Sequence, residues 1–264
     1  MPVMKPALVD RVPDPLASLV LLPSLGTTAR VWDDALARIG PSRADVLRFD
    51  LPGHGSAVVR DDFDIEDLAD EVAAYIATET APGAPVIVAG VSMGGAIAVE
   101  VARRHPRVVD GFAAFSAALR FGTPAGWNEL IGRVRAAGTP GFDREGTLAG
   151  WFTPAYSGGA GEARSAQILD ELVGIDPDGY IECCRALARY DATTGVPSLS
   201  APGAAIAGTA DRAVPPVTTR AIAASGGHIT YRELRGAHLA IVEDAAGAAR
   251  ILRESILRAA SADR

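Results

Sequence analysis

Cysteine is scarce in this chain, which limits the folds and sites that the chain can form. The only two cysteines, Cys183 and Cys184, are adjacent in the sequence. Adjacent cysteines very rarely bond to each other, and two thiols are too few for a disulfide scaffold or a metal site. We therefore expect packed thiols, no metal centre and a reducing, cytoplasmic environment.

Long hydrophobic runs and an excess of basic charge are also missing. The uninterrupted apolar runs, such as residues 19–22, are far shorter than the roughly 20 residues of a membrane-spanning helix. Residues 1–15 contain Asp10 and Asp14 and lack the basic-then-apolar pattern of a signal peptide. The net charge of −7 argues against nucleic acid and acidic membrane surfaces as partners, although a local arginine could still bind a small anion.

The pattern that is present is an alternation of strand and helix signals. With 264 residues, of which 48% are hydrophobic and 22% charged, the chain can form one large domain or about two of average size. Short apolar runs indicate buried strands, and apolar residues at helical spacing follow them. Strands are expected at 19–22, 46–49, 86–89 and 108–116, and helices at 28–39, 64–76 and 95–104. This order predicts an α/β fold, with a parallel sheet covered by helices on both faces.

The alternation stops between residues 118 and 195. Helical signals follow one another there, and Thr123 and Asp176 each precede a proline, as at a helix start. Strand signals resume at 204–207 and 229–234. Such an insertion is expected to form a lid over the carboxyl ends of the strands, where ligands bind in open α/β sheets. The predicted division is a core of residues 1–117 and 196–264 and a lid of residues 118–195.

The segment Gly90-Val91-Ser92-Met93-Gly94 contains a candidate nucleophile. It reads G-x-S-x-G and joins the strand expected at 86–89 to the helix expected at 95–104. A serine at such a corner lies on a strained turn, and its hydroxyl projects above the sheet. The helix N-terminus beneath it offers unpaired N–H groups to a developing oxyanion. Ser92 is therefore the candidate nucleophile.

A serine hydroxyl needs a histidine as base, and the histidine needs a carboxylate to orient it. Asp211 follows the strand expected at 204–207, and His238 follows the strand expected at 229–234. Taken singly, a G-x-S-x-G pattern is weak evidence, Asp211 could open a turn and His238 could cap a helix. Because the three placements agree in order and in strand end, we interpret Ser92, Asp211 and His238 as a catalytic triad.

The other histidines and acids fit these roles less well. His105 precedes a proline at a helix end, and His228 lies before the last expected strand rather than after it. Among the acids, Asp110 lies at the start of its strand, Asp191 in the tail of the insertion and Asp244 in a late helix. None of these positions brings its side chain to the carboxyl end of a strand.

The oxyanion hole is expected to combine two backbone N–H groups. One belongs to Met93, the residue after the nucleophile, and the other to the loop that follows the strand at 19–22. Within that loop we assign the N–H of Leu25, and Gly26 lets the loop turn close to the substrate.

These residues lead to a family resemblance that covers essentially the whole chain. The segment Asp50-Leu51-Pro52-Gly53-His54-Gly55-Ser56 resembles a turn of the α/β-hydrolase superfamily, in which it is structural. The resemblance implies an α/β-hydrolase fold with a mostly parallel sheet and a helical lid, no metal and no organic cofactor. It also implies that His54 is a supporting residue rather than the base. The superfamily often has His-Gly where this chain has Pro23-Ser24, and that histidine usually props the oxyanion loop, so the loop must be supported differently here.

More narrowly, several segments resemble the 3-oxoadipate enol-lactonases of aromatic catabolism. These segments are residues 24–28, 31–33, 122–128, 151–154 and 179–187. Most of them fall in or beside the expected lid, which sets substrate choice. The implied activity is hydrolysis of 3-oxoadipate enol-lactone to 3-oxoadipate, through an acyl-enzyme, in protocatechuate or catechol breakdown.

The expected partner is thus a small anionic lactone. Arg133 or Arg135 could bind the carboxylate of the lactone, and Trp127 could line the pocket around its ring. For the arginines the alternative is a position on a solvated helix face. Trp127 and Trp151 could equally be lid packing. Two other functions stay open: a general carboxylesterase or perhydrolase-like enzyme, and a ligand-binding protein with a vestigial triad. The sequence does not determine the oligomeric state.

Overall fold

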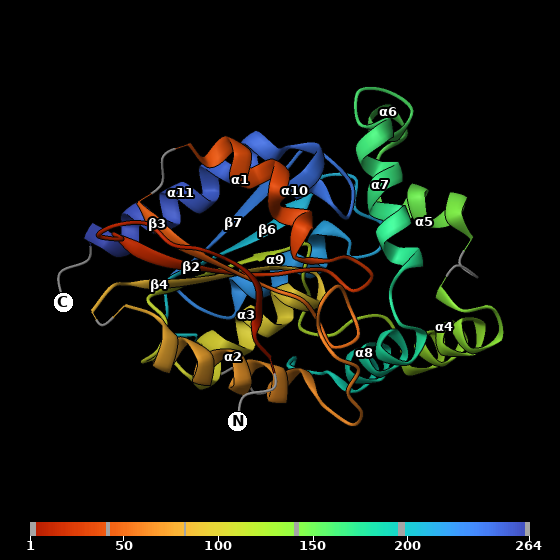
Figure 1. The fold of residues 1–264 in the computed structure, drawn as a ribbon, viewed down its shortest axis with the longest axis horizontal. Coiled ribbons are helices and arrows are strands. Elements are labelled where there is room, and N and C mark those ends of the chain that lie inside the picture. Colours follow the sequence, from red (N-terminus) through yellow and green to blue (C-terminus); the bar gives the residue numbers. More distant parts are fainter. Residues whose placement is uncertain (1–3, 41–42, 82, 140–142, 195–198, 262–264) are drawn as a thin grey trace.

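A seven-stranded sheet forms the centre of the molecule (Figure 1). The computed structural model describes residues 4–40, 43–81, 83–139, 143–194 and 199–261. The spatial order of the strands is β1-β3-β2-β4-β5-β6-β7. Their bounds are β1 Pro6–Asp10, β2 Ala17–Leu22, β3 Ala44–Phe49, β4 Val86–Val91, β5 Gly111–Phe115, β6 Gly203–Gly208 and β7 Ile229–Leu234. Neighbouring strands are parallel except β1, which pairs antiparallel with β3 at the edge.

The central strands are buried on both faces, which explains their continuous apolar sequences. Every residue of β2, β4 and β6 is buried. In β2, Val20 and Leu22 belong to one core cluster, whereas Leu19 and Leu21 belong to the other. Successive side chains of a strand point to opposite faces, so both faces need an apolar cover.

Helices supply that cover on both sides (Figure 1). One core cluster contains apolar residues of α2, α3 and α9, and the other contains residues of α1 and α11. The short helices η1 and α10 directly precede α1 and α11. Their bounds are η1 Ala29–Trp32, α1 Asp33–Ile39, α2 Ile65–Glu79, α3 Met93–Arg104, α9 Pro216–Ala224, α10 Ala240–Glu243 and α11 Ala245–Ser261. The expected mostly parallel sheet with helices on both faces is therefore confirmed.

The described residues form five α-helices between β5 and β6 (Figure 1). They are α4 Pro124–Ala137, α5 Arg144–Trp151, α6 Pro154–Ser157, α7 Glu162–Val173 and α8 Pro177–Arg189. Thr123 and Asp176 cap α4 and α8 with their side chains, as the Thr-Pro and Asp-Pro signals predict. We call residues 124–189 the helical insertion; the predicted boundary between residues 195 and 196 lies outside the described residues.

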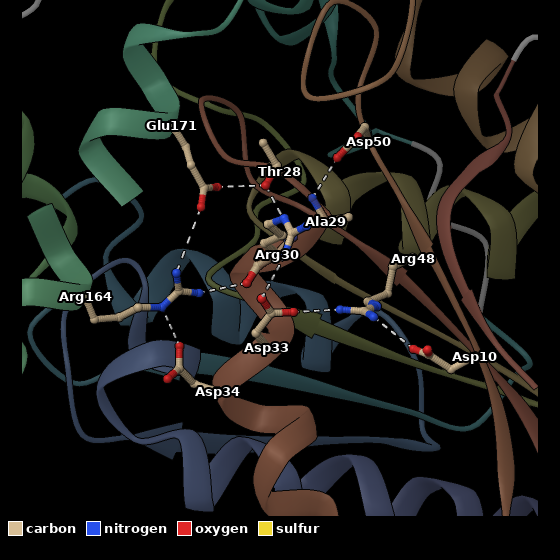
Figure 2. Close-up of polar contacts among 10 residues, drawn as sticks. All are labelled: Asp10, Thr28, Ala29, Arg30, Asp33, Asp34, Arg48, Asp50, Arg164 and Glu171. Atoms are coloured by element: carbon tan, nitrogen blue, oxygen red, sulfur yellow. Dashed lines mark hydrogen bonds and ion pairs between the residues drawn. The ribbon is translucent and has the colours of Figure 1, made fainter. Parts of the chain in front are cut away.

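Polar contacts fasten the insertion to the segment that follows β2 (Figure 2). The guanidinium of Arg164, on α7, donates to the Asp34 carboxylate over 2.6 Å and to the Arg30 carbonyl over 2.7 Å. About two turns further along α7, Glu171 accepts from the Thr28 hydroxyl over 2.7 Å. These charge-assisted bonds join the insertion to residues 28–34 of the core.

Three local features differ from the sequence-based expectations. The edge strand β1 was not expected, because its residues are half-buried or exposed and carry no strong apolar run. The strand expected at 108–116 is shorter, since Val108 is held in a turn by its bond to the His105 carbonyl. The helix expected to begin at Gly95 begins at Met93. Among the described residues, no helix has both the length and the apolar character needed to cross a membrane.

Candidate active site

Ser92 occupies a strained corner between β4 and α3. Its φ of 55° and ψ of −115° lie in a region that residues other than glycine rarely adopt. The corner is held by backbone bonds on both sides: Ser92 N–H donates to the Phe115 carbonyl, and the Ser92 carbonyl accepts from Ala96 N–H. Ser92 is buried, and 7% of the residue's surface is exposed. The sequence-based expectation of a strained serine after a buried strand agrees with this geometry.

The glycines around Ser92 are required by close backbone contacts. A Cβ atom on Gly90 would lie 2.0 Å from the Gly94 carbonyl oxygen, and one on Gly94 would lie 2.5 Å from the Pro23 oxygen. Gly94 N–H also donates to that Pro23 carbonyl over 3.1 Å. The first turn of α3 is therefore pressed directly against the start of the loop that follows β2.

Asp211 and His238 form a buried hydrogen-bonded pair. His238 Nδ1 lies 3.0 Å from Asp211 Oδ2, and the two side chains are 5% and 0% exposed. The other carboxylate oxygen accepts the N–H groups of Ala213 and Val214, each over 2.9 Å. Because an ionised carboxylate can only accept, Nδ1 carries the imidazole proton and Nε2 keeps a lone pair. This arrangement leaves a nitrogen that can act as a base.

All three candidate residues follow the carboxyl ends of parallel strands. Ser92 follows β4, Asp211 follows β6 and His238 follows β7. The carboxyl ends of parallel strands lie at one edge of the sheet, which is where ligands bind in this class of fold. Their catalytic roles stay predictions that the geometry is consistent with.

The two predicted oxyanion donors lie on adjoining segments. Met93 is the first residue of α3, and Leu25 lies in the loop that Gly94 contacts through Pro23. Within the described part of the chain, neither the Met93 nor the Leu25 N–H has a hydrogen-bond partner. Gly26 has a φ of 82°, which only glycine adopts without strain, and it turns the loop. Two free N–H groups, one at a helix start and one on the adjoining loop, can together stabilise an oxyanion.

His54 bonds the candidate oxyanion loop at Gly26, two residues after Ser24. Its Nε2 accepts from Gly26 N–H over 3.1 Å, and its Nδ1 lies 2.9 Å from the Pro52 carbonyl, to which it donates. The ring is fully buried, and burial lowers the pKa of His54 from 6.5 to about 4. A neutral imidazole therefore holds the candidate oxyanion loop in place. The interpretation of His54 as a supporting residue is consistent with these bonds.

The four predicted substrate-binding residues lie in different surroundings. Trp151 packs against the candidate oxyanion loop, since a Cβ on Gly26 would lie 3.1 Å from its indole ring. Trp127 donates its indole N–H to the Phe121 carbonyl over 2.7 Å, at the start of its own helix. Arg133 and Arg135 are exposed on α4. The structure thus places Trp151 against the candidate oxyanion loop, and it places Arg133 and Arg135 on the exposed surface of α4.

Sequence reasoning did not single out Glu243, which accepts hydrogen bonds from the residue before His238 and from the insertion. The only signal in the sequence is its position five residues after the histidine. Among the described residues, no group of three or more histidine, cysteine, aspartate or glutamate side chains is placed to hold a metal ion.

Comparisons with known proteins show which family has a similar sequence and fold. A profile of the alpha/beta hydrolase family matches residues 19–251. A pimeloyl-[acyl-carrier protein] methyl ester esterase of Neisseria meningitidis (serogroup C) is 30% identical over 248 residues, which are 90% of this chain and 89% of that protein. A 3-oxoadipate enol-lactonase of Acinetobacter baylyi is 27% identical over 207 residues, 78% of this chain and 74% of that protein.

A solved structure is similar over nearly the whole chain. The crystal structure of the enol-lactonase from Burkholderia xenovorans LB400 superimposes with a TM-score of 0.87, at 28% identity, and the match covers 95% of each chain. The family profile and the fold both extend across the sheet and the insertion, and the chain therefore belongs to the alpha/beta hydrolase family.

Proposed function

We propose that this protein is a serine hydrolase that opens a small enol-lactone carrying a carboxylate, 3-oxoadipate enol-lactone, through an acyl-enzyme. The observation that carries the reaction type is the buried Asp211–His238 pair together with the strained Ser92 corner, all of which follow the carboxyl ends of parallel strands of one sheet. The substrate class is supported by the resemblance to enol-lactonases in both sequence and fold.

In the first half of the reaction, Ser92 Oγ attacks the lactone carbonyl carbon. His238 Nε2 takes the hydroxyl proton, and the Asp211 carboxylate stabilises the imidazolium that forms. The carbonyl oxygen becomes an oxyanion that the N–H groups of Met93 and Leu25 stabilise, each contributing about 3 kcal/mol. Collapse of this intermediate breaks the ring C–O bond, and His238 returns the proton to the departing enol oxygen.

In the second half, His238 activates water and the acyl-enzyme is hydrolysed. The ring-opened enol is still attached through its acyl group, and its tautomerisation to a ketone disfavours closure of the ring. Water gives its proton to His238 and attacks the ester carbon, after which Ser92 is regenerated and the dicarboxylate product leaves. An enol is a good leaving group, so the reaction needs less assistance than cleavage of an amide.

Trp151 is the best supported of the proposed substrate contacts. Its ring lies against Gly26, next to the Leu25 N–H that would face the oxyanion. An aromatic face at this point can line the acyl pocket. For the substrate carboxylate, Arg133 and Arg135 stay proposals from the sequence, because both are exposed on α4.

A second candidate is hydrolysis of a simple ester. The 30% identity to the pimeloyl-[acyl-carrier protein] methyl ester esterase covers 90% of this chain, more than the match to the Acinetobacter baylyi enol-lactonase covers. The chemistry would be the same, with an alkoxide in place of the enol as leaving group. A general carboxylesterase or perhydrolase-like enzyme would share it too, whereas a ligand-binding protein with a vestigial triad would show no turnover.

The decisive test compares three substrates with one enzyme preparation. We expect kcat/KM to be highest for 3-oxoadipate enol-lactone, lower for the methyl ester of a dicarboxylic acid and lowest for an aryl acetate. In the Ser92→Ala variant, kcat should fall on the order of 10⁴-fold for every substrate. A preference for either ester would replace the lactonase proposal with the esterase one, and Ser92→Ala activity within tenfold of the parent would remove Ser92 as the nucleophile.

A further inference from the structure

We propose that Glu243 is a positioning residue that makes the placement of His238 depend on the docking of the helical insertion. The inference rests on the proposed function, because it assumes that His238 is the catalytic base. It adds a residue outside the triad and the oxyanion hole, and it gives the insertion a direct part in catalysis.

The carboxylate of Glu243 joins the histidine loop to the insertion. Its Oε1 accepts from Ala237 N–H over 2.7 Å and from Thr153 N–H over 3.1 Å. Its Oε2 accepts from the Thr153 hydroxyl over 2.5 Å. Ala237 directly precedes His238, whereas Thr153 caps α6 of the insertion. One oxygen is thus shared between a donor of the core and a donor of the insertion.

The peptide on the other side of His238 is held by the same segment of the insertion. Leu239 N–H donates to the Trp151 carbonyl over 2.9 Å. The residues before and after His238 are therefore both bonded to residues 151–153, through Glu243 on one side and directly on the other. Because two anchor points fix a short loop, the backbone of His238 cannot keep its position if this segment moves away.

The local backbone is shaped to bring Glu243 to this point. Gly236 has a φ of 141°, and a Cβ atom on it would lie 3.0 Å from the Cβ of Glu243. Only glycine combines that conformation with such a close approach. The chain can therefore turn at Gly236, pass through His238 and fold α10 back so that Glu243 reaches Ala237.

Hydrogen bonds to an ionised carboxylate are stronger than those between neutral groups. The half-buried Glu243 carboxylate, bonded to three donors, therefore links the histidine loop rigidly to the insertion. A base must lie within hydrogen-bond reach of the proton that it takes, so small displacements of the imidazole lower the rate. Loss of the Glu243 hydrogen bonds should therefore lower kcat, because His238 acts in both acylation and deacylation. The affinity for substrate, which the pocket walls set, should change much less.

The test compares Glu243→Ala with Glu243→Gln and with a control, Glu254→Ala. Glu254 lies on α11 and pairs with Arg232, away from the histidine loop. In Glu243→Ala we expect kcat to fall 10- to 100-fold and KM to change less than threefold. Glu243→Gln keeps one oxygen for the two N–H groups and an amide for the Thr153 hydroxyl, so it should retain at least a third of the parental kcat. Glu254→Ala should match the parent.

Thr153→Val provides a second measurement that opens no cavity: it removes the hydroxyl bond to Glu243, and it also removes the cap that the same hydroxyl gives to α6. The kcat of Thr153→Val should fall three- to tenfold. Adding Thr153→Val to Glu243→Ala should lower kcat no further, because both changes break the same link between Glu243 and the insertion. If the two effects multiply in the double variant, if Glu243→Ala keeps the parental kcat, or if Glu243→Gln falls as far as Glu243→Ala, the inference is wrong.

His238→Ala separates this inference from the proposed function. If His238→Ala keeps parental turnover of the lactone, the proposed function fails, since its base is dispensable. If His238→Ala is inactive while Glu243→Ala is fully active, only the inference about Glu243 fails. Circular dichroism and thermal unfolding of each variant establish that a lower kcat is measured on folded protein.

Discussion

At the scale of single residues, His54 illustrates how a buried polar group can serve the site without reacting. Its ring lies under Tyr180 of α8, with the centroids 6.1 Å apart, and it bonds Gly26 on one side and Pro52 on the other. Both bonds require the neutral tautomer with the proton on Nδ1. Protonation would put a second hydrogen where Gly26 donates, which agrees with a pKa of His54 near 4.

This pKa predicts how His54 changes stability with pH. Between pH 6.5 and 4 the unfolded chain binds a proton on His54 that the folded chain does not bind. The free energy of unfolding should therefore drop as the pH falls, by about 3 kcal/mol from this residue alone over that interval. Urea unfolding at pH 7, 5.5 and 4 measures it, and His54→Gln, which has no group that titrates there, should show a shallower decline. Equal declines in parent and variant would contradict the assignment.

At the scale of elements, close contacts between backbones lock the insertion and the loops together. Gly179, on α8, meets Gly53 in the turn that carries His54, and a Cβ atom on Gly179 would lie 2.5 Å from the Gly53 Cα. The Asp176 N–H also donates to the Gly53 carbonyl over 3.2 Å. The start of α8 is therefore pressed against the turn that supports the candidate oxyanion loop.

Gly179→Ala should separate these two elements. With a Cβ atom in place, α8 or the turn must shift, so we expect the free energy of unfolding to fall by about 1–3 kcal/mol. Gly132→Ala is the matched control, since Gly132 lies within α4 with nothing within 4 Å of its Cβ position. That change should stabilise the helix by up to about 1 kcal/mol. Chemical unfolding of both variants tests the pair, and equal effects would show that the contact is not tight.

At the scale of the whole molecule, the sheet and the insertion share their apolar cores. Leu172 and Leu187 of the insertion belong to the cluster that contains α2 and α3. Phe152 and Ile168 belong to the cluster on the other face. Because apolar side chains of both parts are buried together, loss of either part would expose the other to water.

The shared cores predict one cooperative unfolding transition. The three tryptophans report on both parts: Trp32 lies in the core, whereas Trp127 and Trp151 lie in the insertion. The tryptophan fluorescence of Trp32→Phe comes from the insertion, and that of the Trp127→Phe/Trp151→Phe double variant comes from the core. In each variant, fluorescence and far-ultraviolet circular dichroism should give the same midpoint of unfolding. An earlier fluorescence transition in Trp32→Phe would mean that the insertion unfolds by itself.

The order of strands and helices, the Ser92 corner and the positions of Asp211 and His238 could be predicted from the sequence. Each depends on a local pattern, such as an apolar run, a Pro after a cap or a G-x-S-x-G segment, and one topological rule places the carboxyl ends of the strands together. Local patterns were less informative at β1, an exposed edge strand, and at the start of β5, where a turn replaces the expected strand.

Tertiary structure alone decided which distant groups support the site. His54 bonds Gly26 across 28 positions of sequence, and Glu243 bonds Thr153 across 90. By itself the sequence determined that Pro23-Ser24 stands where the superfamily often has His-Gly, and the family resemblance predicted that His54 is a supporting residue. The sequence could not determine that His54 bonds this loop at Gly26. The meeting of a donor and an acceptor so far apart depends on how the sheet, the loops and the insertion pack, and no local periodicity encodes that packing.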